Sequence, residues 1–255
     1  MESVRVSLLT QVYGQPGIFK KFTDALRGWP ADLARECELV VVDDCGVPPV
    51  ELSEVDGLGP MGVQLLRHTK DVPWAQPCCR NLAAKHARGE RLILLDPDMI
   101  IPPRMALRFV QEATSLPRGH VTRFCLKEAN WKKKLGETNT SSPNAWILHK
   151  KDFQAVHGYN ECFAGHKGWS DVELMHVLDS AYKVRQDRKL TVDFYRRSGE
   201  LTDADVRSLE REVKTNMRIH SRHREEVRKK FNGNWHKWVI AKGPTTRNLP
   251  SVKLI

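Results

Sequence analysis

Residues 91–99 read Arg-Leu-Ile-Leu-Leu-Asp-Pro-Asp-Met. The apolar run 92–95 is typical of a buried strand, and the proline that follows Asp96 fixes a tight turn. Asp96 and Asp98 flank that proline, so both carboxylates can face one hard cation such as Mn²⁺ or Mg²⁺, which prefers oxygen ligands. Asp-x-Asp also occurs by chance, and the alternative is an ordinary loop with a helix-capping Asp.

A second apolar run that ends in two carboxylates lies earlier in the chain. The β-branched run 38–42 predicts a buried strand that stops at Asp43 and Asp44, where a carboxylate could accept hydrogen bonds from a ribose or a base. A strand-end turn without a ligand is the alternative. Cys78-Cys79-Arg80-Asn81 opens a helical segment that ends at Gly89, and Arg80 and Asn81 could orient a phosphate or a neighbouring carboxylate.

The order of these segments predicts the fold class. Strands are expected at 4–10, 38–42, 63–66 and 91–95, with helices at 18–26 and 80–88 between them. This alternation indicates an α/β protein with a mixed, mostly parallel, doubly wound sheet flanked by helices. Ligands bind such sheets beyond the carboxyl ends of the strands, where the acidic residues lie.

Beyond residue 104 the pattern is looser. A helix is expected at 106–113, strands at 120–126 and 145–149, a polar loop at 131–144 that contains Lys132–Lys134, and a long polar helix from Thr202 to about 230. We predict a catalytic domain at 1–200 and a basic helical C-terminal extension at 201–255 packed on it.

Composition narrows the function classes. The 255 residues carry a formal net charge of +10, much of it after residue 180, which favours phosphates, nucleic acid or anionic surfaces as partners. A solvated basic surface is the alternative. The six cysteines show no zinc spacing and are expected to be reduced thiols. Neither a transmembrane run nor a signal peptide is recognisable, so a cytoplasmic location is expected.

Taken in order, these motifs resemble the GT-A glycosyltransferases, especially those of the family-two type. The resemblance continues through Gly158-Tyr159-Asn160-Glu161 and Gly168-Trp169-Ser170-Asp171-Val172-Glu173 and covers roughly residues 4–180. It implies a nucleotide-sugar half at 1–100 and an acceptor half at 101–200. In the first half, Thr10 and Asp43 or Asp44 would lie against the nucleoside.

The resemblance also implies a reaction centre. Asp96 and Asp98 would reach the nucleotide ribose and the metal, with Asp98 the direct ligand. Asp171 falls where inverting members place the general base, although Ser170 stands where the family usually has Glu, and Glu173 is the alternative base. Trp169 is the expected acceptor contact.

A C-terminal histidine often completes the metal site in related galactosyltransferase-like proteins. The segment 216–223 offers His220, our first choice, and His223.

The function indicated is transfer of a hexosyl or pentosyl group from a nucleoside-diphosphate sugar, UDP-sugar by default, to an acceptor hydroxyl. The acceptor could be a glycan, a protein or a lipid-linked sugar. It could also be a hydroxymethylated base in DNA, held by the basic residues between 183 and 230, the Lys132–Lys134 loop and the aromatic pair Trp235 and Trp238. Alternatives from other classes are a nucleotidyltransferase and a non-enzymatic nucleic-acid-binding module.

Overall fold

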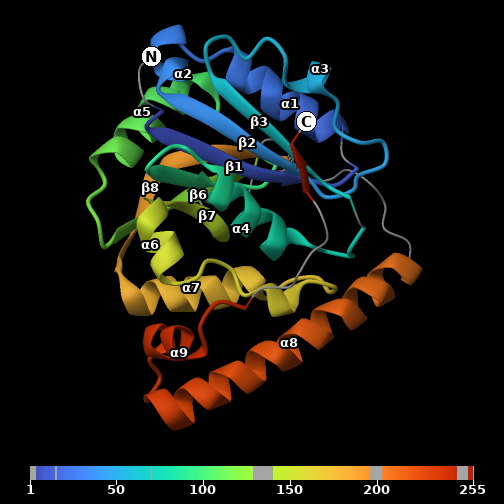
Figure 1. Cartoon of the computed structure of the whole chain (residues 1–255), viewed down its shortest axis with the longest axis vertical. Helices are drawn as coiled ribbons and strands as arrows, with labels where there is room; N and C mark the ends of the chain where they lie inside the picture. Colours follow the sequence, from blue (N-terminus) through green and yellow to red (C-terminus); the bar gives the residue numbers. More distant parts are fainter. Residues whose placement is uncertain are drawn as a thin grey trace.

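The computed structural model describes residues 4–14, 16–69, 71–128, 140–195, 203–245 and 252–254. One mixed sheet of nine strands runs through it in the order β5-β8-β6-β7-β4-β1-β2-β3-β9 (Figure 1). Its strands are β1 (Val6–Val12), β2 (Cys37–Asp43), β3 (Gly62–His68), β4 (Arg91–Leu94), β5 (Met99–Ile100), β6 (His120–Glu128), β7 (Thr140–His149), β8 (Lys183–Phe194) and β9 (Val252–Leu254).

Four parallel strands form the N-terminal part of the sheet. Strand β1 lies between β2 and β4, and β3 adds beyond β2, all in the same direction. Strand β7 then pairs with β4 in the antiparallel direction and begins the second half, in which β6 and β8 are again parallel to each other. The carboxyl ends of β1, β2 and β4 therefore open on the same edge of the sheet.

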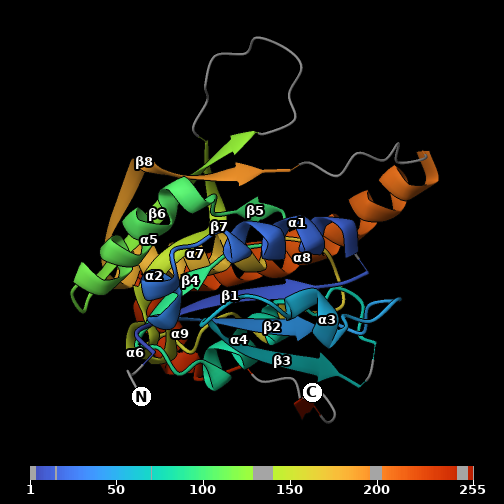
Figure 2. The same cartoon turned by 90° about the horizontal axis from the view of Figure 1, so that it is seen from above.

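Helices cover both faces of the sheet. They are α1 (Pro16–Arg27), α2 (Ala31–Arg35), α3 (Leu52–Val55), α4 (Gln76–His86), α5 (Pro103–Ser115), α6 (Lys150–Ala155), η1 (Glu161–Phe163), α7 (Ser170–Ala181), α8 (Asp203–Phe231) and α9 (Trp235–Lys242). Helices α1, α2 and α5 pack on one face, and α4, α6 and α7 pack on the other (Figure 2).

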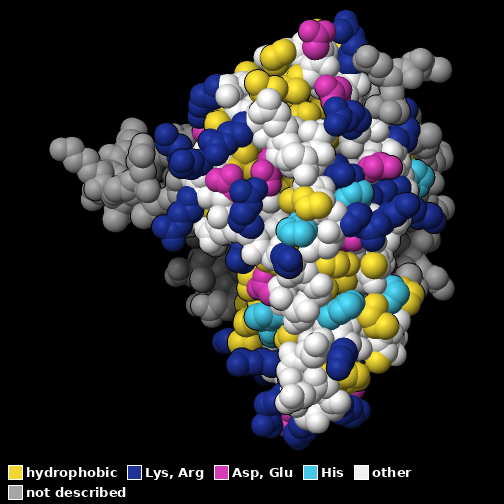
Figure 3. Space-filling model, turned by 90° about the vertical axis from the view of Figure 1, so that its left-hand side faces the viewer, with side chains coloured by type: hydrophobic (Ala, Val, Ile, Leu, Met, Phe, Trp, Pro, Cys, Tyr) yellow, Lys and Arg dark blue, Asp and Glu magenta, His cyan; other side chains and the backbone are white. Residues whose placement is uncertain are grey.

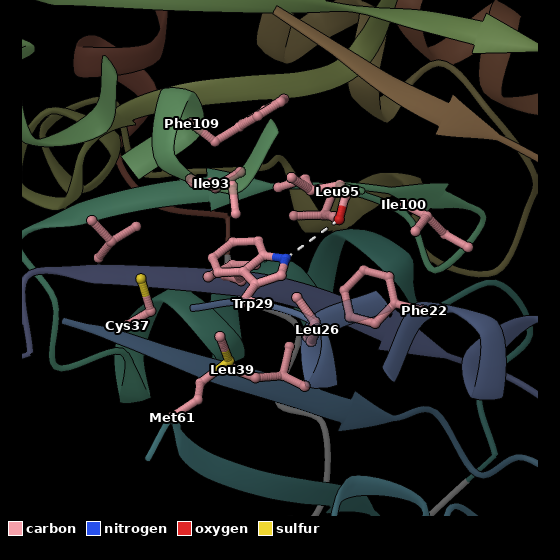
Figure 4. Packing of buried hydrophobic residues seen from close by; sticks show 14 of the residues in the cluster. Phe22, Leu26, Trp29, Cys37, Leu39, Met61, Ile93, Leu95, Ile100 and Phe109 are labelled. Atoms are coloured by element: carbon pink, nitrogen blue, oxygen red, sulfur yellow. Dashed lines mark hydrogen bonds between the residues drawn. The ribbon is translucent and has the colours of Figure 1, made fainter. Parts of the chain in front are cut away.

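The sheet separates two hydrophobic cores because side chains alternate along a strand. In β2, Leu39 and Val41 join the core under α1 and α5, whereas Val40 and Val42 join the core under α4 and α7. All of β2 is buried, which explains its continuous apolar run. In the first core, the Trp29 indole donates a hydrogen bond to the Ile101 carbonyl at 3.4 Å (Figure 4).

The C-terminal segment wraps the outside of the second layer. Helix α8 runs across the outer side of α7 and α9, and α9 packs directly on α7 (Figure 1). Strand β9 then pairs with β3 in the antiparallel direction, at the far edge of the sheet. The segment after residue 200 is therefore not wholly helical, because its end completes the sheet of the N-terminal half.

The predicted α/β class with a mixed sheet flanked by helices is confirmed. Strand β8, helix α9 and strand β9 were not predicted. The Lys132–Lys134 loop and the predicted helix start at Thr202 lie outside the described residues. All six cysteines are free thiols. In the part of the chain that is described, no helix is long and apolar enough to cross a bilayer.

Leu39→Ala tests the central role of β2. Leu39 is fully buried, and its truncation is expected to lower the free energy of unfolding by about 2–5 kcal/mol through lost burial and a residual cavity. Urea unfolding measures this difference. Leu107→Ala is the matched control, because Leu107 is 55% exposed and its truncation should change stability by less than about 0.5 kcal/mol. Equal losses in the two variants would contradict this account of the core.

Candidate active site

A buried ion pair lies at the edge where the parallel strands end. The Arg80 guanidinium, from α4, is 0% exposed and donates to Asp96 Oδ1 at 2.6 Å. Gln11, near the end of β1, accepts from Arg80 Nε and donates to the same Asp96 oxygen at 3.0 Å. Burial alone would lower the pKa of Arg80, but the Asp96 carboxylate raises it above its usual value. Arg80 is therefore a permanent cation inside the site.

Asn144 connects this pair to the predicted base. Its side-chain amide, on β7, donates to Asp96 Oδ2 at 2.9 Å. The same side chain lies near Asp171, at the start of α7, and partly lowers the pKa of that carboxyl. Strand β7 pairs with β4, so the pairing of the sheet itself brings Asn144 beside the turn after β4. The structure thus brings together Arg80, Asp96 and Asp171, which lie far apart in sequence.

The environment of Asp171 suits a general base. Burial raises its pKa to about 7, the negative charge of Asp96 adds to the rise, and Arg80, Asn144 and Ser170 oppose it. A carboxyl group with a pKa near neutrality can accept a proton and return it.

Asp98 lies one residue beyond Pro97, in a turn closed by a hydrogen bond from the Met99 amide to the Asp96 carbonyl at 2.9 Å. Its side chain is partly exposed, unlike that of Arg80. No group of three or more His, Cys, Asp or Glu residues able to hold a metal is present among the described residues. The carboxylates of Asp96 and Asp98 still fit Mg²⁺ or Mn²⁺, because such ions commonly bind one or two carboxylates and complete their shell with substrate phosphates and water.

The two carboxylates after β2 differ in environment. Asp43 accepts from the backbone amides of Gly46 and Val50 at 2.9 and 3.0 Å and from Arg67 Nε at 2.9 Å, so it shapes the following loop. Burial raises the pKa of Asp44 to about 7, although hydrogen bonds from Cys79 and the Ala75 amide lower it in part.

Among the described residues at the ends of β1 and β2, Asp44 Oδ1 and the hydroxyl of Thr10 are buried oxygens without a hydrogen-bond partner.

Asn81 and Glu173 bind other parts of the chain. The Asn81 amide group donates to the Tyr159 carbonyl and to Glu161, and its oxygen accepts from the Tyr159 amide, so it fixes the Gly-Tyr-Asn-Glu segment against α4. Glu173 accepts from Asn160 at 2.6 Å and lies 2.8 Å from His223 Nδ1. Burial alone would raise the pKa of Glu173, but these contacts hold it below its usual value.

His220 is buried between aromatic rings. It stacks on Trp169 and Trp235 with ring centroids 4.9 and 5.4 Å apart, and its Nδ1 lies 3.6 Å from Glu173 Oε2. It also stacks on His176, with ring centroids 5.5 Å apart. The role of His220 or His223 as third metal ligand stays a prediction. Gln11 and Asn144 were not predicted as site residues.

No family model matches the chain, and no curated protein matches its sequence. Solved structures do match its fold. S. aureus TarS in complex with UDP-GlcNAc superposes with a TM-score of 0.57 and 17% identity over 77% of this chain and 60% of that one. The mannosyltransferase PcManGT from Pyrobaculum calidifontis, in complex with GDP-Man and Mn²⁺, gives 0.59 and 13% over 87% and 65%.

GalNAc-T7 with UDP, GalNAc and Mn²⁺ gives a TM-score of 0.61 and 14% identity over 94% of this chain and 56% of that one. The chain thus spans about three-fifths of the length of these solved chains, of which the TarS one is residues 1–349. The likeness shows that it has the GT-A fold, as the motifs predict.

Asp171→Asn tests the environment of the predicted base. The pKa of Asp171 is about 7 in the folded chain and about 3.9 in an unfolded one. Between these values the unfolded chain loses a proton that the folded chain keeps, so this group lowers stability as pH rises. The variant is therefore expected to gain in Tm relative to wild type from pH 4.5 to pH 7.5. Asp32→Asn, at a fully exposed position, is the control. A difference in Tm between Asp171→Asn and wild type that does not change with pH would contradict the raised pKa of Asp171.

Proposed function

We propose that the chain is a metal-dependent glycosyltransferase that moves a hexosyl or pentosyl group from a nucleoside-diphosphate sugar to an acceptor hydroxyl. The observation that carries the proposal is the cluster of the buried Arg80 and Asp171 with the partly buried Asp96 and Asn144, beside the carboxyl ends of the parallel strands. Of the solved structures with this fold, the TarS structure holds UDP-GlcNAc and the PcManGT structure holds GDP-Man and Mn²⁺. The GalNAc-T7 structure holds UDP, GalNAc and Mn²⁺. A UDP-sugar is our first choice of donor.

The donor is proposed to bind along the ends of β1, β2 and β4. Asp44 and Thr10 are proposed to lie against the nucleoside, since each has a buried oxygen without a partner among the described residues. Asp43 shapes the loop beside them. Arg80 is proposed to act through Asp96, because it fixes the orientation of that carboxylate. Asn81 is proposed to position the acceptor half of the site through Glu161.

Asp98 is the proposed direct metal ligand, and Asp96 is proposed to reach the metal or the ribose from the same turn. When bound, Mn²⁺ or Mg²⁺ would stabilise the negative charge that develops on the departing diphosphate. His220 is left out of this set, because its neighbours are Glu173 and two tryptophans.

Asp171 is the proposed general base. Its carboxylate takes the proton of the acceptor hydroxyl as that oxygen bonds to the anomeric carbon and the bond from this carbon to the diphosphate oxygen breaks. Attack from the face opposite the leaving group inverts the anomeric centre. Trp169 is proposed to stack on the acceptor, and Glu173 to position α7 through Asn160 and His223 rather than to act as the base.

Donor binding is the first expected property. Mn²⁺ together with one of UDP, GDP, CDP or ADP should raise the thermal stability of the protein, by about 2.7 kcal/mol at a hundredfold excess over the dissociation constant. Asp98→Ala should abolish the metal-dependent part of this shift, while Asp32→Ala should keep it. A wild-type protein that responds to none of the nucleotides would refute the transferase proposal and favour a nucleic-acid-binding module.

DNA with hydroxymethylated bases is the proposed acceptor. The support is the outer face of α8, where the exposed Arg218, Arg222, Arg224 and Arg228 form no ion pair with any described side chain. Like charges at i and i+4 cost a helix about 0.2–0.5 kcal/mol per pair, which bound phosphates would offset. The end of α8 also lies among Lys and Arg side chains at the foot of Figure 3.

The predicted aromatic contribution to a DNA surface is wrong, because Trp235 and Trp238 are buried in the core beside α7. The proposal therefore rests on charge alone.

Duplex DNA is expected to bind with an affinity that falls steeply as salt rises. Arg222→Ala should weaken binding to all sequences alike and reduce the salt slope by about one. Lys20→Ala, which removes a cation already paired with Asp24 on α1, is the control. With the donor found above, sugar should pass to hydroxymethylated but not to unmodified DNA. Transfer to a glycan, protein or lipid-linked sugar in place of DNA would exclude this acceptor.

A further inference from the structure

The turn that leads into α7 has an unfavourable backbone. Gly168 and Trp169 have φ values of +81° and +70°, directly before Ser170 and Asp171. A left-handed conformation suits Gly168, but it is uncommon for a bulky residue such as Trp169 and persists only where the surroundings enforce it. Because Trp169 is the N-cap of α7, the conformation of this turn sets the direction in which the helix leaves and hence the place of Asp171.

Asn216 of α8 supplies that enforcement. Its side chain is 0% exposed, and its Nδ2 donates to the carbonyl oxygens of Phe163, His166 and Gly168 at 3.0, 2.6 and 2.9 Å. The two N–H groups of this amide are therefore shared among three carbonyl oxygens of the segment 163–168, including that of the residue directly before Trp169.

Two more residues of α8, one and two turns further along, bind the other side of the same turn. His220 stacks on the Trp169 indole with an interplanar angle of 27°, and His223 pairs with the buried Glu173 of the first turn of α7. Asn216, His220 and His223 lie on one face of α8, since their spacing of four and three residues is that of a helix face. That face meets the backbone of the turn, the ring of Trp169 and the first turn of α7.

We propose that Asn216 is a positioning residue for Asp171, and that α8 is thereby an integral part of the active site rather than an appendage to it. Asn216 acts through the backbone: it holds Gly168 and Trp169 left-handed, and the turn in that form places the Asp171 carboxylate beside Asn144 and Asp96. This inference rests on the proposed transferase function for its effect on turnover. It rests on the structure alone for its effect on the turn.

The experiment compares two variants that disturb the turn from opposite sides. Asn216→Leu keeps the size of the side chain and removes the donor. Gly168→Ala leaves α8 untouched and disfavours φ +81°, with no atom within 4 Å of the added methyl group. Ser221→Ala, at an exposed position on α8, is the control. Hydrogen exchange of residues 163–171, donor binding by thermal shift, and kcat for metal-dependent release of nucleoside diphosphate are measured for each.

Both variants are expected to exchange faster at 163–171 but not at 91–95, to bind donor as wild type does, and to lose kcat on the order of 10²-fold, the effect of a misplacement of about 1 Å. The double variant should lose little more than either single one, because the two changes release the same turn. Ser221→Ala should match wild type in every measurement.

Unchanged exchange at 163–171 in Asn216→Leu would overturn the proposal, as would faster exchange with full kcat in both variants. Loss of donor binding in step with kcat would show a general structural role and would also overturn it. A wild-type protein that binds no donor would refute the transferase function instead, and hydrogen exchange would then still decide whether Asn216 holds the turn.

Discussion

The buried contact between Arg80 and Asp96 is the constraint on which the site depends. A guanidinium without access to water must have a carboxylate partner, because an uncompensated buried charge is strongly destabilising. Arg80 therefore fixes Asp96, and Gln11 and Asn144 add further hydrogen bonds to the pair. One pair thus ties α4, β1, β7 and the turn after β4 into a single unit, and Asp171 takes its electrostatic environment from it.

This unit explains how two carboxylates can lie close together and differ in chemistry. Asp96 accepts hydrogen bonds from Arg80 and from the side-chain amides of Gln11, Gln76 and Asn144. Asp171 is more deeply buried, and burial together with the negative charge of Asp96 raises its pKa to about 7. The number of donors around each carboxylate is thus the main difference between their surroundings.

The sequence was most informative where burial is simple. Strands β1, β2 and β4 are buried on both faces and therefore read as apolar runs, and the carboxylates that follow them could be expected at one edge. Strand β8 was not predicted because its first half, Lys183 to Lys189, is mostly polar and exposed. Asn144 and Gln11 could not be assigned roles, since they reach Asp96 from 48 and 85 residues away through the pairing of the sheet.

The histidines show a different limit of sequence reasoning. His220 and His223 lie in a segment that resembles a metal-binding one, but the partners of a helix are set by its packing, and α8 packs on α7 with both rings turned toward Glu173. Asn216, four residues before His220, belongs to no motif that would have predicted its role. Its importance follows only from the three carbonyl oxygens that the fold places around it.

The two borders of the sheet have a consequence for how molecules of this protein meet one another. Strand β9 covers β3 and is only three residues long, so that border offers little backbone for a neighbouring molecule to pair with. At the other border, the two-residue strand β5 covers only the end of β8, at Asp193 and Phe194. The uncovered start of β8 carries Lys183, Arg185, Arg188 and Lys189, and β8 shifts its register against β6. Short strands, cationic side chains and irregular pairing all hinder strand addition between molecules, so crowding is expected to leave this sheet without a route to edge-to-edge aggregation.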